Sequence, residues 1–147
     1  MTETLLVDDH LLLRVLLQQE PAELRSRGVI IATTGLWYHR LCRAVSDQAV
    51  VGSMSRRLGD VDSSVAATAI AAVIQLPESI QLLSLRSLGW PMSMLVHAGA
   101  RLNLLSLEAL AAARHLSAEI CLADVDNNEA LRSAAARFGV PVRSIAG

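Results

Sequence analysis

The chain has 147 residues, of which 52% are hydrophobic, and this length and apolar content fit one domain spanning residues 1–147 with a developed core rather than a disordered chain. No apolar run reaches the ~18 residues of a transmembrane helix, and an acid stands where a secretory signal carries basic residues, so we expect a cytoplasmic protein without a membrane segment. The formal net charge of −1 gives no overall signature of nucleic-acid binding.

The first predicted strand, Leu5–Val7, ends on two adjacent acids, Asp8 and Asp9. In an open parallel sheet covered by helices on both faces, ligands and metals collect at the carboxyl ends of the strands. Asp8 is therefore placed where chemistry is expected. The alternative is that Asp8 or Asp9 only caps the following helix. A second strand that ends in an acid, Glu119–Asp124, favours the functional interpretation of Asp8.

Four more elements are predicted before residue 46. Leucines and valines cover most of the first helix, which should pack across the sheet, and proline then interrupts the helical pattern. A β-branched run predicts the second strand, and a threonine can cap the next helix. These elements are the helix at Leu11–Leu17, a short helix at Ala22–Arg27, the strand at Val29–Ile31, and a helix from Thr33 or Thr34 to about Val45.

The remaining pattern alternates helices with short strands. Strands separated by helices need right-handed crossovers, which predicts a three-layer α/β/α sandwich with a mostly parallel central sheet. The predicted elements are a helical stretch at Ala49–Leu58, a helix from Asp62 or Ser63 to before Pro77, a strand at Ile80–Leu85, helices at Ser87–Ala98 and Leu104–Leu116, the strand at Glu119–Asp124, a helix at Glu129–Phe138 capped by Asn127 or Asn128, and a strand at Val140–Ser144.

Two segments, LLVDDHLLL at the start and LEALAAARHLSAEICLADVDNNEALRSAAARFGVPV at the end, resemble a PIN domain. The resemblance implies a small parallel α/β fold, often homodimeric, whose clustered acids bind Mg²⁺ or Mn²⁺ and cleave RNA. Many such domains are toxins of bacterial toxin–antitoxin pairs. The resemblance therefore implies an RNA substrate, an antitoxin-type protein partner and a homodimer. The high apolar content of the helix-rich middle also favours self-association.

The resemblance also implies which residues are catalytic and bind metal. Asp8 matches the acid that ends the first strand, Glu108 the acid that opens the late helix, and Asp124 the acid after the fourth strand. Asp126 is a nearby substitute for Asp124. A register without a gap puts Ser106 in the place of Glu108.

The segment TTGLWYHRLCRAV departs from the family pattern, because Arg40 stands where the family normally carries a glutamate. Divalent ions such as Mg²⁺ need oxygen ligands, and a guanidinium repels them. Two unit charges about 4 Å apart interact by roughly 4 kcal/mol at an effective dielectric near 20, enough to change site occupancy. We therefore expect Arg40 to pair with Asp8 or Glu108 and to leave the nuclease weakly active or inactive. The alternative is that Arg40 faces solvent in a shifted alignment.

Several residues are candidates for substrate binding. Arg40 and Arg43 can meet phosphate, and His10 either lines the site or is only a first-turn helix residue. Trp37 and Tyr38 can stack on a base, although core packing is favoured for Trp37. The competing function is a non-catalytic RNA- or protein-interaction domain that retains the fold. A nucleotide-binding regulatory domain has no support, because the sequence carries neither a G-x-G-x-x-G nor a P-loop signature.

The two cysteines, Cys42 and Cys121, lie in apolar surroundings without the spacing of a metal site. They are predicted to be buried thiols rather than a disulfide or a zinc site.

Overall fold

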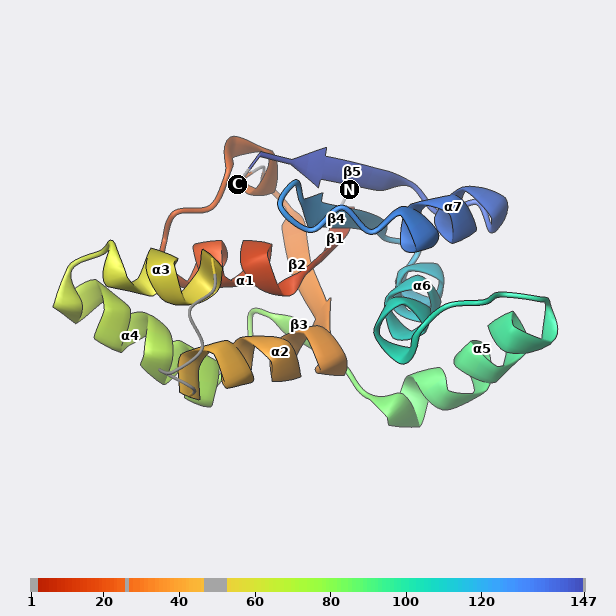
Figure 1. Ribbon diagram of the computed structural model, residues 1–147, viewed down its shortest axis with the longest axis horizontal. Helices are drawn as coiled ribbons and strands as arrows, with labels where there is room; N and C mark the ends of the chain where they lie inside the picture. The colour runs from red at the N-terminus through yellow and green to blue at the C-terminus, as the bar shows by residue number, and fades with distance from the viewer. Residues whose placement is uncertain (1–2, 26, 47–52, 147) are drawn as a thin grey trace.

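The computed structural model describes residues 3–25, 27–46 and 53–146, and these form a five-stranded parallel sheet between two groups of helices (Figure 1). The strand order is β3-β2-β1-β4-β5, with β1 in the centre, and the predicted three-layer α/β/α sandwich is confirmed. The strands are β1 (Glu3–Val7), β2 (Val29–Thr34), β3 (Gln81–Leu83), β4 (Glu119–Ala123) and β5 (Val142–Ile145).

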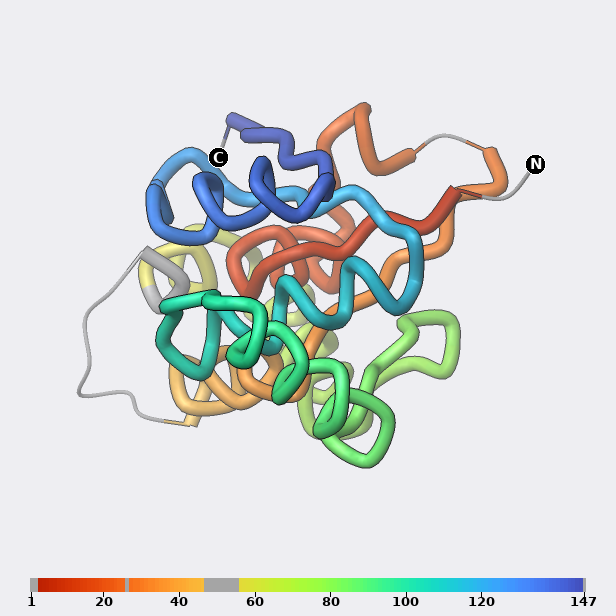
Figure 2. Tube along the Cα trace, turned by 90° about the vertical axis from the view of Figure 1, so that its right-hand side faces the viewer, coloured from red at the N-terminus to blue at the C-terminus, as the bar shows by residue number. Residues whose placement is uncertain are grey.

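Helices α1 to α4 lie on one side in Figure 1 and α5 to α7 on the other. Figure 2, viewed from the second side, shows α5 alongside α6, with α7 above them in the picture. Within the described ranges, no helix is long and apolar enough to cross a membrane. The helices are α1 (Asp9–Leu16), α2 (Gly35–Ser46), α3 (Ser53–Gly59), α4 (Ser63–Ile74), α5 (Leu85–His97), α6 (Leu104–Leu116) and α7 (Glu129–Arg137), with a 3-10 turn, η1, at Ala22–Leu24.

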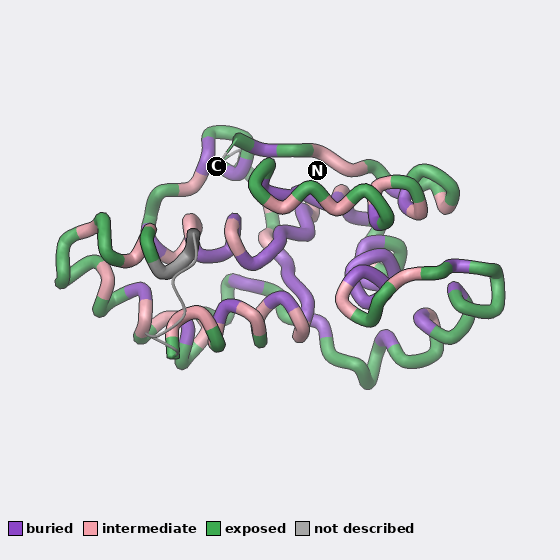
Figure 3. Tube along the Cα trace, viewed as in Figure 1, coloured by how far each residue is buried: buried purple, intermediate pink, exposed green. Residues whose placement is uncertain are grey.

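The central strand supplies side chains to two hydrophobic cores. Leu5 and Val7 pack with α1, α2 and α4, whereas Leu6 packs with α5, α6 and α7. Successive side chains of a strand point to opposite faces, so a continuous apolar run is needed when both faces are covered. Figure 3 shows the result: β1 and α6 are largely buried, and the outer helix α5 is largely exposed.

Most helix boundaries agree with the sequence expectations because local caps define them. Asn103 and Asn128 accept backbone N–H groups at the starts of α6 and α7, and the Thr34 hydroxyl accepts the Trp37 N–H at the start of α2. The prediction at Ala22–Arg27 was too long, since a single 3-10 turn forms there. Residues 49–52 of the stretch predicted at Ala49–Leu58 lie outside the described residues.

The two cysteines are free, and Cys121 is buried while Cys42 is half-buried. Burial raises the pKa of the Cys121 thiol to about 12, so it is protonated and inert at neutral pH.

Candidate functional site

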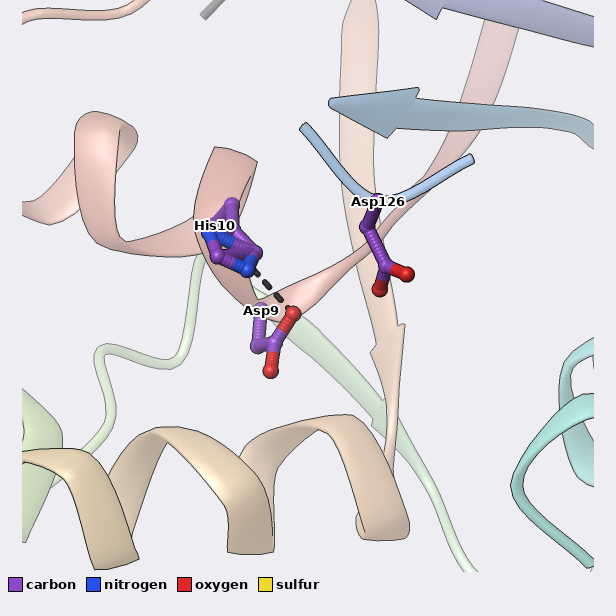
Figure 4. Close-up of side chains that lie close together, drawn as sticks. All are labelled: Asp9, His10 and Asp126. Carbon is purple, nitrogen blue, oxygen red and sulfur yellow. Dashed lines mark hydrogen bonds between the residues drawn. The ribbon is translucent and has the colours of Figure 1, made fainter. Parts of the chain in front are cut away.

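Three potential metal ligands meet at the carboxyl edge of the sheet. Asp9 and His10 lie in the first turn of α1, directly after β1, and Asp126 lies in the connection between β4 and α7. One ligand atom from each lies within 4.8 Å of the others (Figure 4). Asp9 is fully buried, whereas His10 and Asp126 are half-buried. This cluster, Asp9, His10 and Asp126, is called the acid–histidine site below.

Arg40 of α2 supplies a positive charge to the acid–histidine site. Its Nε atom lies 2.9 Å from Oδ2 of Asp9, and its Nη2 atom lies 3.5 Å from Oδ2 of Asp126. Although the first distance is short, Asp9 Oδ2 accepts no hydrogen bond of acceptable geometry from any described residue. The contact is therefore an ion pair with poor alignment, and the guanidinium bridges two carboxylates.

Burial and neighbouring charges oppose each other at Asp9. Burial raises the pKa of this carboxyl, and the charges of Arg40 and His10 lower it. The other oxygen of Asp9, Oδ1, accepts the backbone N–H of His10 at 3.0 Å. Burial outweighs these charges, so the pKa of Asp9 lies above its usual value, and Arg40 supplies the largest charge compensation.

Asp8, predicted to be a metal ligand, uses both carboxylate oxygens in backbone hydrogen bonds. Oδ1 accepts the Leu11 N–H and Oδ2 accepts the Ala123 N–H, each at 2.9 Å. Asp8 is fully buried, and this burial raises its pKa to about 6. The structure thus shows Asp8 as the N-cap of α1 and as a link to β4, while its role as a ligand stays a prediction.

Glu108 and Asp124, the other predicted catalytic acids, are not part of the acid–histidine site. Glu108 is 1% exposed, and its Oε1 atom accepts the Leu36 N–H at 2.9 Å, at the positive start of α2. Asp124 is exposed at the end of β4. Ser106, the alternative to Glu108, accepts a hydrogen bond of 2.8 Å from the Asn128 side chain. Of the predicted metal ligands, Asp126 alone joins this group.

The predicted substrate-binding residues fall into two groups. Arg40 and His10 lie at the acid–histidine site, and Arg43 is exposed one turn farther along α2. Trp37 is 2% exposed in the core, which confirms packing as its role. The half-buried Tyr38 donates its hydroxyl to the Val73 carbonyl.

Sequence reasoning missed Asp9 as a member of the site. The sequence offered Asp9 only the alternative role of a helix cap, a role also considered for Asp8, whereas in the structure Asp8 is the cap and Asp9 begins the helix. The signal in the sequence was the presence of two adjacent acids, Asp8 and Asp9. One of them can cap the helix, and the other is then available as a ligand of the site.

The arrangement can act in two chemical ways. Two carboxylates and an imidazole form a donor set for a divalent cation. Arg40 instead provides positive charge at the same place without a metal ion, which gives a structural ion-pair network.

No protein-family model and no curated protein matches this chain.

Proposed function

We propose that the chain is a PIN-like domain, resembling metal-dependent ribonucleases of toxin–antitoxin systems, whose hydrolysis of RNA is weak or absent. One observation carries this proposal: the Arg40 guanidinium lies between Asp9, at 2.9 Å, and Asp126, at 3.5 Å. The parallel sheet with acids at its carboxyl edge supports the nuclease ancestry. The bridging cation supports the loss of activity, because it lies where a metal ion would be attracted.

The donor set fits a divalent ion in number but not in charge. Asp9, His10 and Asp126 would hold Mg²⁺ or Mn²⁺, and Asp8, Glu108 and Asp124 remain candidate catalytic residues near the same edge. A bound ion would polarise a phosphate oxygen of RNA and activate a water molecule. Arg40 lowers the net negative charge of the two carboxylates, which weakens their attraction for the ion. Arg40 and the exposed Arg43 would meet phosphate groups instead.

The test is cleavage of an unstructured RNA and Mn²⁺ binding by calorimetry, with the natural protein, Arg40→Glu, and Arg40→Glu combined with Asp126→Asn. We expect little cleavage by the natural protein. The first variant should bind Mn²⁺ at least about tenfold more tightly, a difference of about 1.4 kcal/mol, and the second should lose this gain. Arg43→Glu is the matched control, since Arg43 lies on the same helix but outside the acid–histidine site.

The proposal fails if the natural protein cleaves RNA strongly with Mn²⁺ and Asp126→Asn or Asp8→Asn abolishes the cleavage. The chain would then be an active nuclease despite Arg40.

The second candidate function is a non-catalytic RNA- or protein-interaction domain, favoured by apolar side chains exposed on α5. Trp90 is 74% exposed, and Leu85, Val96 and Met94 are also exposed on this helix. Trp90 and Met94 lie four residues apart and therefore share one face of α5, and exposed apolar patches usually mark an interface. Fluorescence anisotropy with a labelled RNA in the presence of EDTA distinguishes the RNA-binding form of this function, because it detects binding that needs neither metal nor cleavage.

A further inference from the structure

We propose that the acid–histidine site binds a transition-metal ion of the Zn²⁺ or Co²⁺ class in preference to Mg²⁺, and that this ion and Arg40 exclude each other. The inference deepens the proposed function and rests on it, because it names the class of ion that the same site selects. It differs from what the PIN resemblance implies both in the ligands, Asp9 and His10 in place of Asp8, and in the metal.

The chemistry of the donors favours this class of ion. Mg²⁺ binds oxygen and keeps much of its water, whereas imidazole nitrogen suits Zn²⁺ and related transition ions. In the tetrahedral geometry usual for Zn²⁺, bonds of about 2.0–2.2 Å to nitrogen and oxygen place two ligand atoms roughly 3.3–3.6 Å apart. The ligand atoms of Asp9, His10 and Asp126 lie within 4.8 Å of one another, so binding of an ion would draw the three side chains closer together.

A buried acceptor in the site lacks a suitable donor. Asp9 is 0% exposed, and its Oδ2 atom accepts no hydrogen bond from the described residues. A buried carboxylate oxygen normally has such a partner, and Arg40 approaches it only with poor alignment. A metal ion needs no such alignment of a donor hydrogen, so Asp9 Oδ2 is an oxygen ready for coordination. Asp9 Oδ2 is thus a buried acceptor whose partner is a neighbouring charge and not an aligned donor, and this unsatisfied hydrogen-bonding capacity favours coordination of an ion.

The backbone already holds the ligands in place. Asp8 connects the first turn of α1 to β4 through the Ala123 N–H, and the Asp126 N–H donates to the Ala123 carbonyl at 3.0 Å. The segment with Asp9 and His10 and the segment with Asp126 are therefore tied to the same residue. Asp8 acts as a positioning residue, and little ordering is needed when the ion binds.

Arg40 can leave the site without unfolding the helix that carries it. Its side chain is 39% exposed, on a surface of α2. An ion bound to both Asp9 and Asp126 repels the guanidinium, which can then rotate into water. Metal binding therefore replaces one cation by another at the same carboxylates.

The experiment measures binding of Co²⁺, by its visible absorption, and of Zn²⁺ and Mg²⁺, by calorimetry. The proteins are the natural chain, Arg40→Gln, and Arg40→Gln combined either with His10→Gln or with Asp126→Asn. We expect Arg40→Gln to bind one Co²⁺ at least about tenfold more tightly than the natural chain. Each added substitution should remove that gain, while His10→Gln should leave the weak binding of Mg²⁺ unchanged.

His39→Gln in the Arg40→Gln background is the matched control, since His39 is exposed on α2 and should not affect binding. Circular dichroism of each variant shows whether it is folded. Asp126→Asn, in a half-exposed connection, tests the site if His10→Gln fails to fold.

The inference is overturned if Arg40→Gln binds no Co²⁺, or if its Co²⁺ binding is unchanged by both His10→Gln and Asp126→Asn. Binding of Mg²⁺ as tight as that of Co²⁺ also overturns it, yet leaves the proposed function standing. Conversely, strong RNA cleavage by the natural protein overturns the proposed function and not the choice of metal.

Discussion

Asp8 and Ala123 lie 115 positions apart in the chain, and the Ala123 N–H donates a 2.9 Å hydrogen bond to Oδ2 of Asp8. The other oxygen of the same carboxylate caps α1 through the Leu11 N–H. One buried side chain therefore joins the central strand, the first helix and β4. It sets the geometry of the sheet edge at which the acid–histidine site lies.

Replacing Asp8 with alanine should lower the free energy of unfolding by about 2–4 kcal/mol, because it removes a helix cap and leaves the buried Ala123 N–H without an acceptor. Urea denaturation followed by circular dichroism measures the change. Asn103→Ala is the control, since it removes the cap of α6 at an exposed position and should cost only about 1 kcal/mol. Equal losses in the two variants would show that the link to β4 contributes nothing.

Stability should depend on the protonation of Asp8. Burial raises the pKa of this carboxyl from 3.8 to about 6 in the folded protein, so the folded state binds the proton more tightly than the unfolded state does. The part of the stability that comes from protonation of Asp8 is then fully present below about pH 4 and is lost as the pH rises through about 6, whereas the two backbone hydrogen bonds of the carboxylate remain.

This pH dependence is measured as the difference in free energy of unfolding between the natural protein and Asp8→Asn, by urea denaturation from about pH 4 to about pH 7. As the pH rises, the natural protein should lose roughly 3 kcal/mol of unfolding free energy relative to Asp8→Asn, at 1.36 kcal/mol per pKa unit. A difference that stays constant, or that moves the other way, would contradict the raised pKa.

Replacing Arg40 with glutamine should lower the free energy of unfolding by about 1–3 kcal/mol near neutral pH, because it leaves the buried Asp9 carboxylate without its cation. The lower part of this range allows for the Arg40 side chain being 39% exposed, since solvent screening weakens its attraction to Asp9. The penalty should shrink as the pH falls, since a protonated Asp9 needs no cation. Arg43→Gln is the control, at an exposed position of α2, and a loss as large as that of Arg40→Gln would argue against a specific role for the ion pair.

Much of the fold can be predicted from the sequence because its signals are local. The helix predicted at Leu104–Leu116 has the bounds of α6, with Asn103 as its cap. The strand predicted at Glu119–Asp124 forms as β4, one residue shorter. Ala22–Arg27 shows the limit of such signals: among the described residues between Pro21 and the Gly28 turn, a single 3-10 turn forms at Ala22–Leu24.

The site is harder to predict because its contacts join distant segments. Sequence reasoning placed Arg40 among the acids, but expected it to pair with Asp8 or Glu108, whereas the described structure pairs it with Asp9 and Asp126. The reason is that Asp8 and Glu108 already accept backbone N–H groups, from Ala123 and from Leu36. No spacing in the sequence reveals which of two adjacent acids receives a hydrogen bond from a strand more than a hundred residues away.

Self-association remains a prediction, and α5 offers the surface for its test. Trp90 on this helix is 74% exposed, and burying such a side chain between two copies removes a large apolar area from water. If the homodimer forms through α5, Trp90→Ser should shift the protein from dimer to monomer in sedimentation experiments at micromolar concentration, without changing its circular dichroism spectrum. Ile74→Ser is the matched control, because Ile74 is 76% exposed at the end of α4, a helix that lies on the opposite side of the sheet from α5 (Figure 1). A monomeric natural protein well above micromolar concentration would rule out the homodimer, and a dimer that Trp90→Ser leaves intact would exclude α5 as its interface.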